Sequence, residues 1–102
     1  MKSTVNYYDF RDAFRAHDRL DNFTSDGLRV LFDDLTRYED DCGQEVELDV
    51  IAFCCEYTEF TLSEASREYD LHFDDIDELA AHLQEHTHVC GTTDDTVVFQ
   101  CY

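Results

Sequence analysis

The 102-residue sequence contains no proline and only three glycines, Gly27, Gly43 and Gly91. The chain has no proline-rich hinge or linker, so we expect residues 1–102 to form one domain. The glycines are too widely spaced for a phosphate-binding loop, a GxGxxG motif or a nucleophile elbow. We therefore predict that the protein is not an enzyme, with no catalytic residues and no cofactor.

Long apolar runs of the membrane type are also missing. Residues 1–4 lead into a polar, aromatic segment without the apolar core of about seven residues that a signal peptide needs. No stretch approaches the ~20 apolar residues of a membrane span. The five cysteines are an odd number without a CxxC pair, which argues against a disulfide framework. We expect a cytoplasmic protein with free thiols and no membrane contact.

Basic residues are scarce, since seven Lys and Arg stand against 25 Asp and Glu, a formal net charge of −18. Residues 1–37 hold six basic and seven acidic side chains, whereas residues 38–102 hold Arg67 against eighteen acids. This charge exceeds the magnitude of ~2 to 8 that suits a small domain, and it strains a compact fold by self-repulsion. It predicts a basic partner and no direct binding of nucleic acid, with a purely solubilising surface as the alternative.

The only long apolar run lies within residues 45–60. Its first half alternates the carboxylates of Glu45, Glu47 and Asp49 with aliphatic residues, and its second half is apolar on both sides. Alternation of this kind is typical of a strand with one charged face. We therefore predict a central strand over residues 46–55, with its cysteines as small apolar residues of a buried strand.

Helical spacing of apolar residues predicts a helix capped by Asp9 and a second helix capped by Ser25 and ended by Gly43. Beyond the expected strand, Ser63 is the predicted cap of a short helix, and residues 74–78 begin another.

The C-terminal part reads as a hairpin, because two β-prone runs, 86–90 and 96–101, flank a turn with Gly and Asp. The predicted fold is a small α+β domain. It has a three-stranded, mainly antiparallel sheet of residues 46–55, 86–90 and 96–101, with three to four helices packed on one face.

Three carboxylates lie at the C-terminal end of the second expected helix, where acidic residues are unfavourable. Glu39, Asp40 and Asp41 stand in its last turn, where the helix dipole is already negative and each acid costs roughly 0.3 to 1 kcal/mol. If the helix ended earlier, they would lie in a solvated turn, and both readings stay open. Acids placed unfavourably without compensation suggest function. The predicted partner-binding set is Glu39, Asp40, Asp41, Glu45, Glu47 and Asp49, with Glu56, Glu59, Asp74, Asp75, Asp77 and Glu78 as a second row.

A histidine and cysteine pattern precedes the C-terminal turn. His86, His88 and Cys90 alternate along an expected strand, with His82 one helical turn earlier, and imidazole with thiolate suits zinc. The sequence offers no second ligand cluster and no assignable water-activating carboxylate. We predict no metal site and keep a small metal-binding module as an alternative.

Residues 8–14, 22–35 and 47–60 resemble small acidic proteins encoded by phages and mobile elements, over roughly the first two-thirds of the chain. Within that group, size and charge resemble anti-CRISPR proteins that mimic DNA, including inhibitors of type I-C systems. The resemblance implies a monomeric inhibitor in the bacterial host cytoplasm. Its partner would be the basic surface with which a CRISPR-Cas or restriction protein reads the PAM or admits DNA.

Charge supports the same interpretation independently. DNA carries one negative charge per ~1.7 Å of axis, and DNA-binding proteins present grooves of Lys and Arg to it. Rows of carboxylates on a rigid protein can occupy such a groove. An acidic protein-interaction adaptor, which binds through exposed Tyr and Phe and uses its charge for solubility, stays open as the alternative function.

Overall fold

The computed structural model describes residues 5–19 and 22–101; residues 1–4, used above to argue against a signal peptide, lie outside this part. Over the described residues the chain forms five helices and three strands. They are α1 (Tyr7–Ala16), α2 (Ser25–Cys42), α3 (Val50–Glu56), β1 (Tyr57–Thr61), α4 (Leu62–Tyr69), α5 (Ile76–Gln84), β2 (Val89–Thr92) and β3 (Thr96–Gln100). The predicted α+β class, with a three-stranded antiparallel sheet, is confirmed. None of the helices in this part is long and apolar enough to cross a membrane.

The strand order is β1-β3-β2, so the last strand of the chain lies in the middle of the sheet. Both of its neighbours run antiparallel to it, with Glu59 opposite Val98 on one side and Thr92 opposite Val97 on the other. The predicted C-terminal hairpin is therefore present, although its first strand begins at Val89 rather than at residue 86.

The prediction of a central strand over residues 46–55 is wrong. Residues 44–49 have no regular secondary structure, Val50–Glu56 forms α3, and the strand begins only at Tyr57. Asp49 explains the change, because its Oδ1 accepts a hydrogen bond from the Ala52 N–H at 3.1 Å and so caps a helix. Val50 and Phe53, three residues apart, are the buried positions of that helix.

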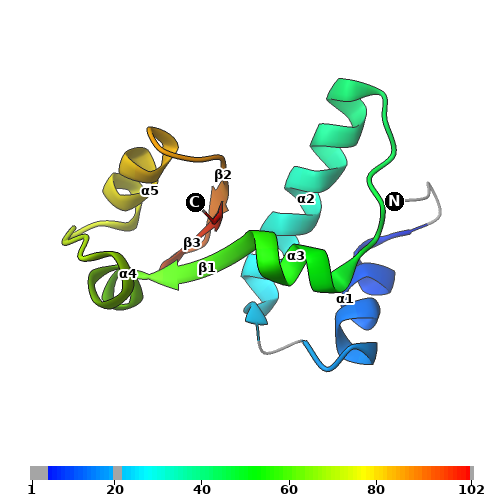
Figure 1. Ribbon diagram of the computed structural model, residues 1–102, viewed down its shortest axis with the longest axis horizontal. Helices are drawn as coiled ribbons and strands as arrows, with labels where there is room; N and C mark the ends of the chain where they lie inside the picture. Colours follow the sequence, from blue (N-terminus) through cyan, green and yellow to red (C-terminus); the bar gives the residue numbers. More distant parts are fainter. Residues whose placement is uncertain (1–4, 20–21, 102) are drawn as a thin grey trace.

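Helices cover both faces of the sheet, not the single face that was predicted (Figure 1). Successive side chains of a strand point to opposite faces. On β3, Val98 joins a core with α1, α2 and α3, whereas Val97 and Phe99 join a second core with α4 and α5. The full burial of all three side chains follows from their place between two helical layers. The first core also contains Phe10, Phe14, Leu28, Leu31 and Phe53, and the second also contains Ala65, Leu79 and Leu83.

The N-cap of α1 lies three residues before the predicted cap, Asp9. Asn6 is the N-cap, and its side chain accepts a hydrogen bond from the Asp9 N–H at 3.0 Å. The Asp9 carboxylate in turn accepts one from the Asn6 N–H at 3.3 Å, so the two residues form a capping box.

The later caps shift by one or two residues. Thr24, rather than Ser25, caps α2, and its Oγ1 accepts a hydrogen bond from the Gly27 N–H at 3.0 Å. Thr61, rather than Ser63, caps α4. Each shift replaces one good capping residue by a neighbour of the same kind, so the apolar faces of the helices stay close to the prediction.

Candidate functional site

Helix α2 continues to Cys42, so Glu39, Asp40 and Asp41 do lie in its last turn, which contains no basic residue. This confirms the predicted placement against the dipole and removes the alternative of a solvated turn beyond the helix. Gly43 then ends the helix in the left-handed region, with φ 64°, as predicted.

After Gly43 the chain turns back and runs beside α2 to α3 (Figure 1). The Glu39 carboxylate fixes the start of this segment by accepting a hydrogen bond from the Val46 N–H at 2.8 Å. Glu45, Glu47 and Asp49 are exposed, whereas Val46 and Leu48 between them pack against the first core. The alternation therefore does produce a charged row, but on an extended segment outside the sheet. We call the six residues Glu39, Asp40, Asp41, Glu45, Glu47 and Asp49 the α2 acidic end.

Two members of the α2 acidic end also have local structural roles. Asp49 caps α3, and Glu39 holds the segment after Gly43. Partial burial raises the pKa of Glu39, but hydrogen bonds to the ionised carboxylate, including that from Val46, outweigh burial and lower the pKa overall. Asp40, Asp41, Glu45 and Glu47 are exposed. These four residues are therefore the ones that can be changed with the least effect on the fold.

The predicted second row does not continue the first. Asp74, Asp75, Asp77 and Glu78 lie at the start of α5, and α5 packs on the opposite face of the sheet from α2 (Figure 1). We call these four residues the α5 acidic group. Asp75 caps α5 by accepting a hydrogen bond from the Asp77 N–H at 2.7 Å. Asp94 and Asp95 of the β2–β3 turn, which the sequence analysis left out, line the same surface hollow as Asp74, Asp75 and Asp77.

The carboxylate of Glu59, which was predicted to bind a partner, instead forms hydrogen bonds within the protein. It accepts hydrogen bonds from the Thr24 N–H and Oγ1, both at 2.7 Å, and from the Thr96 Oγ1 at 2.6 Å. The buried Gly27 lies against the same carboxylate, where a Cβ would collide with it. Glu59 therefore joins β1 to the positive N-terminal end of α2 and to β3. Glu56, by contrast, is exposed.

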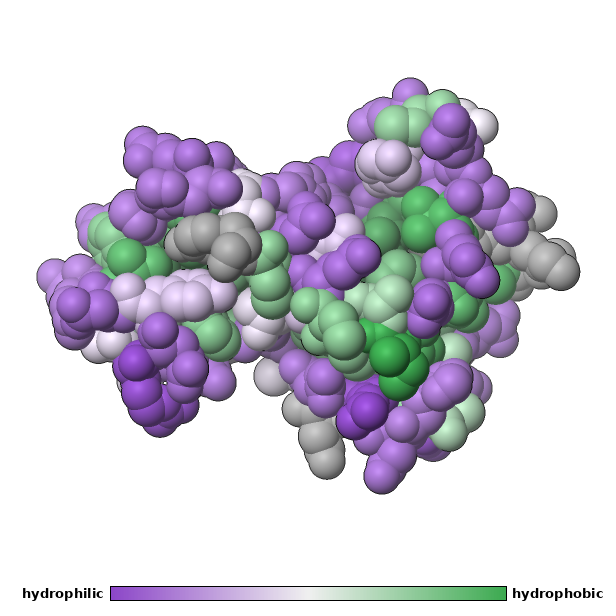
Figure 2. Space-filling view, in the orientation of Figure 1, coloured by the Kyte–Doolittle hydropathy of each residue, from purple (hydrophilic) through white to green (hydrophobic). Residues whose placement is uncertain are grey.

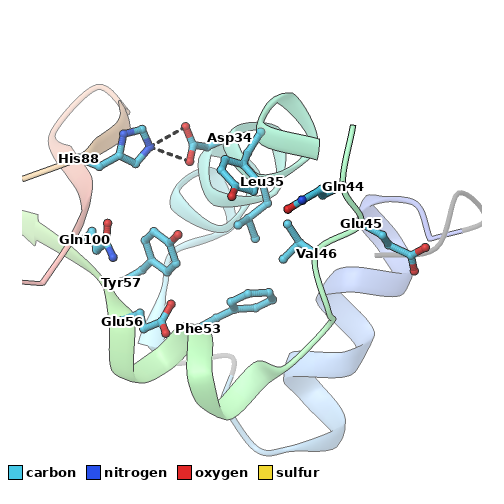
Figure 3. A pocket seen from close by; sticks show the side chains of 11 residues that line it. Asp34, Leu35, Gln44, Glu45, Val46, Phe53, Glu56, Tyr57, His88 and Gln100 are labelled. Atoms are coloured by element: carbon cyan, nitrogen blue, oxygen red, sulfur yellow. Dashed lines mark hydrogen bonds and ion pairs between the residues drawn. The ribbon is translucent and has the colours of Figure 1, made fainter. Parts of the chain in front are cut away.

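A cavity of about 560 Å³ opens beside α2, bounded by residues 44–46, by α3 and by the end of the sheet (Figure 3). Phe53 and Leu35 give it an apolar side, and Tyr57, His88 and Gln100 give it polar groups. Burial, with the nearby Cys90 and Asp34, raises the pKa of Tyr57 to about 12. The phenol therefore stays protonated above pH 10, where an ordinary tyrosine ionises.

Asp34 lies at the edge of this cavity and is another residue that the sequence analysis missed. It belongs to α2 and is buried, with only 8% of its surface exposed. The His88 Nε2 lies 2.9 and 3.1 Å from its two carboxylate oxygens (Figure 3). One sequence signal marked its position, because Asp34 follows Leu31 by three residues and so falls on the apolar stripe of α2.

The predicted alignment of His86, His88 and Cys90 on one strand face does not form, because residues 86–88 precede the strand. Donor atoms of Asp34, His88 and Cys90 instead lie within 4.8 Å of one another. His86 belongs to a separate cluster with His82 and Glu85 at the end of α5. Burial and the neighbouring Asp34 raise the pKa of the Cys90 thiol far above its ordinary value.

The chain matches no model of a protein family, no curated protein and no solved structure.

Proposed function

We propose that this protein is an anti-defence inhibitor that binds the basic, PAM-reading or DNA-admitting surface of a CRISPR-Cas complex and competes with DNA for it. The observation that carries this proposal is the α2 acidic end. Three carboxylates occupy the last turn of a helix with no basic residue in that turn, and three more follow on the adjoining segment.

The electrostatics favour a role for these charges in a complex. The last carbonyl groups of a helix carry about −0.5 elementary charge, so the carboxylates of Asp40 and Asp41 repel the helix end in the free protein, whereas the hydrogen bond from Val46 stabilises the ionised Glu39. Lys and Arg of a DNA-binding groove would replace this repulsion by attraction, and they would also speed association. An arrangement that is unfavourable alone and favourable with a basic partner is what a DNA-like ligand needs.

The acidic end is also held in place before any partner arrives. Helix α2 packs its buried face into the first core, and the hydrogen bond from Val46 to Glu39 fixes the segment that follows the helix. Fixed charges need little ordering on binding, so more of the attraction is available as affinity.

The proposal is tested by competition with DNA for a purified type I-C effector complex, measured by fluorescence anisotropy at several salt concentrations. The test variant carries Asp40→Asn, Asp41→Asn, Glu45→Gln and Glu47→Gln, which spare the two residues with local structural roles. The matched control carries Asp74→Asn, Asp77→Asn, Glu78→Gln and Asp94→Asn, which remove the same charge from the other face and keep the Asp75 cap.

Wild type and control are expected to displace DNA, with affinity that falls steeply as salt rises. The test variant is expected to bind at least tenfold more weakly and with a shallower salt dependence. If the test variant competes like wild type, the α2 acidic end is not the contact surface. If wild type leaves DNA bound to this complex and to other CRISPR-Cas complexes tested alongside it, the proposed function is wrong.

One observation favours an interaction adaptor as a second candidate. Tyr38 and Ile51 are 51% and 44% exposed. Apolar side chains gather over α3 and beside α2 on a face that is otherwise largely hydrophilic (Figure 2). A partner that docks on this apolar area would bind with weak salt dependence, and the same titration separates the two candidates.

A further inference from the structure

We propose that Asp34, His88 and Cys90 form a binding site for a Zn²⁺ ion. One carboxylate, one imidazole and one thiol converge from two elements, with their donor atoms within 4.8 Å of one another. Asp34 comes from α2, Cys90 from β2, and His88 immediately precedes β2. The site is independent of the proposed function, because it uses none of the residues of the α2 acidic end.

The burial of two of the three groups distinguishes this cluster from the acids on the surface. Asp34 and Cys90 are 8% and 7% exposed, so the fold places a carboxylate beside a thiol in its interior. A buried carboxylate needs a pairing group or a metal ion, and in this structure the exposed imidazole of His88, 2.9 Å from Asp34 Oδ2, pairs with it. The guanidinium of Arg37 lies 3.8 Å from Asp34 Oδ1, on a side chain that is 62% exposed. A cation held between the three donors would satisfy all of them at once.

The donor set selects the class of metal. Thiolate and imidazole suit zinc, whereas Mg²⁺ and Ca²⁺ prefer oxygen ligands alone. Zinc sites place S, N and O donors about 2.0 to 2.3 Å from the ion, which sets neighbouring donors roughly 3.5 Å apart. Donors already within 4.8 Å reach that spacing through small side-chain movements.

The cavity beside Asp34 supplies room for a fourth ligand. Asp34 and His88 both line it, and Tyr57 and Glu56 line it too (Figure 3). Three protein ligands with one open position admit water or a group from a partner. The structure thus assigns a three-ligand site that faces a cavity, rather than a closed four-ligand one.

The histidine cluster at the end of α5 provides the internal control. His82, Glu85 and His86 also bring three donor atoms within 4.8 Å, but the cluster contains no thiol, and Glu85 and His86 are exposed. A double variant, His82→Gln with His86→Gln, removes that cluster and leaves Asp34, His88 and Cys90 unchanged.

The experiment titrates the purified, metal-free full chain with Zn²⁺ against a chromophoric chelator, and then with Co²⁺ as a spectroscopic probe. Wild type is expected to bind one equivalent of either metal. With Co²⁺ it should show a thiolate-to-cobalt charge-transfer band together with the visible bands of a tetrahedral ion. Asp34→Asn and His88→Gln should weaken binding more than tenfold, and Cys90→Ser should abolish the charge-transfer band.

Two controls keep the result interpretable. Two further variants should bind like wild type, because neither changes Asp34, His88 or Cys90. One is the double variant His82→Gln, His86→Gln. The other is the triple variant Cys42→Ser, Cys55→Ser, Cys101→Ser, which changes three exposed cysteines. His88 is exposed as well, so His88→Gln tests the site without disturbing the core. The proposal is overturned if wild type binds no stoichiometric metal, or if the charge-transfer band survives Cys90→Ser. It is also overturned if binding disappears in the histidine double variant.

Discussion

The Glu59 carboxylate lies 2.7 Å from both the backbone nitrogen and the hydroxyl oxygen of Thr24, and so joins strand β1 to the first turn of helix α2. Asp49 and Asp75 likewise accept hydrogen bonds at the N-terminal ends of α3 and α5. Negative charge is favourable at these positions. The fold therefore uses part of its acidic excess at helix N-termini, whereas Asp40 and Asp41 sit at the opposite end of a helix, where the dipole opposes them.

The first prediction concerns the stability that Glu59 provides. Glu59→Ala removes three charge-assisted hydrogen bonds and leaves the Thr24 N–H without this acceptor, so the free energy of unfolding should fall by about 2 kcal/mol. The matched control is Glu56→Ala, an exposed neighbour of the same type, which should change it by less than about 0.5 kcal/mol. Urea denaturation measures both. Equal effects of the two substitutions would contradict the internal role of Glu59.

The second prediction tests the contact between Gly27 and Glu59 by a double-mutant cycle. A Cβ at position 27 would displace the Glu59 carboxyl from its hydrogen bonds with Thr24 and Thr96, so Gly27→Ala in wild type should be destabilising. Without Glu59 the collision disappears, and the higher helix propensity of alanine should make the same change neutral or stabilising by up to about 1 kcal/mol. The coupling energy from urea denaturation should exceed about 0.5 kcal/mol. An additive cycle would show that the two residues do not interact.

Most of the correct part of the fold prediction came from the helical spacing of apolar residues. Leu28, Leu31 and Leu35 mark the buried face of α2, and they are buried in the structure. The prediction of a strand over residues 46–55 was wrong because alternation of charged and apolar residues does not distinguish a strand of a sheet from a segment outside the sheet that packs on a core. The Asp49 cap then starts a helix in a stretch of β-prone residues, which is a local override of propensity by capping and packing.

The two candidate sites also differ in whether the sequence could predict them. The carboxylates at the end of α2 could be predicted, because their position depends on one helix and its stop at Gly43. The cluster of Asp34 with His88 could not, because these residues are 54 positions apart and meet only when α2 packs against the hairpin. A single sequence contains no signal for that pairing.

The third prediction concerns alkaline pH and Tyr57. The unfolded phenol ionises near the ordinary pKa of 10.0, whereas burial, the largest cause, raises the pKa in the fold to about 12. Between these values the folded chain holds a proton that the unfolded chain has lost. The stabilisation is therefore complete below pH 10 and disappears as pH rises through about 12. Tyr57→Phe should flatten the fall in unfolding free energy over this range.

Absorbance of phenolate measures the same group directly. Subtracting the alkaline titration of Tyr57→Phe from that of wild type should leave a single step with a midpoint near 12, provided that circular dichroism shows both proteins folded. A step centred near 10 would mean that burial does not raise the pKa of the Tyr57 phenol, and the predicted pH dependence of stability would then be wrong.

The last prediction isolates the cost of the acids at the end of α2. Asp40→Asn with Asp41→Asn should raise the free energy of unfolding by about 0.3 to 1 kcal/mol for each site, because both carboxylates oppose the helix dipole and the net charge of −18. Asp26→Asn, in the first turn of the same helix, is the control with the opposite expected sign, since a carboxylate there complements the dipole. Thermal melts should show wild type gaining stability with added salt, and the advantage of the double variant shrinking as screening increases. If the double variant and Asp26→Asn shift stability in the same direction, position along the dipole is not what makes these acids costly, and the electrostatic argument for the α2 acidic end loses its basis.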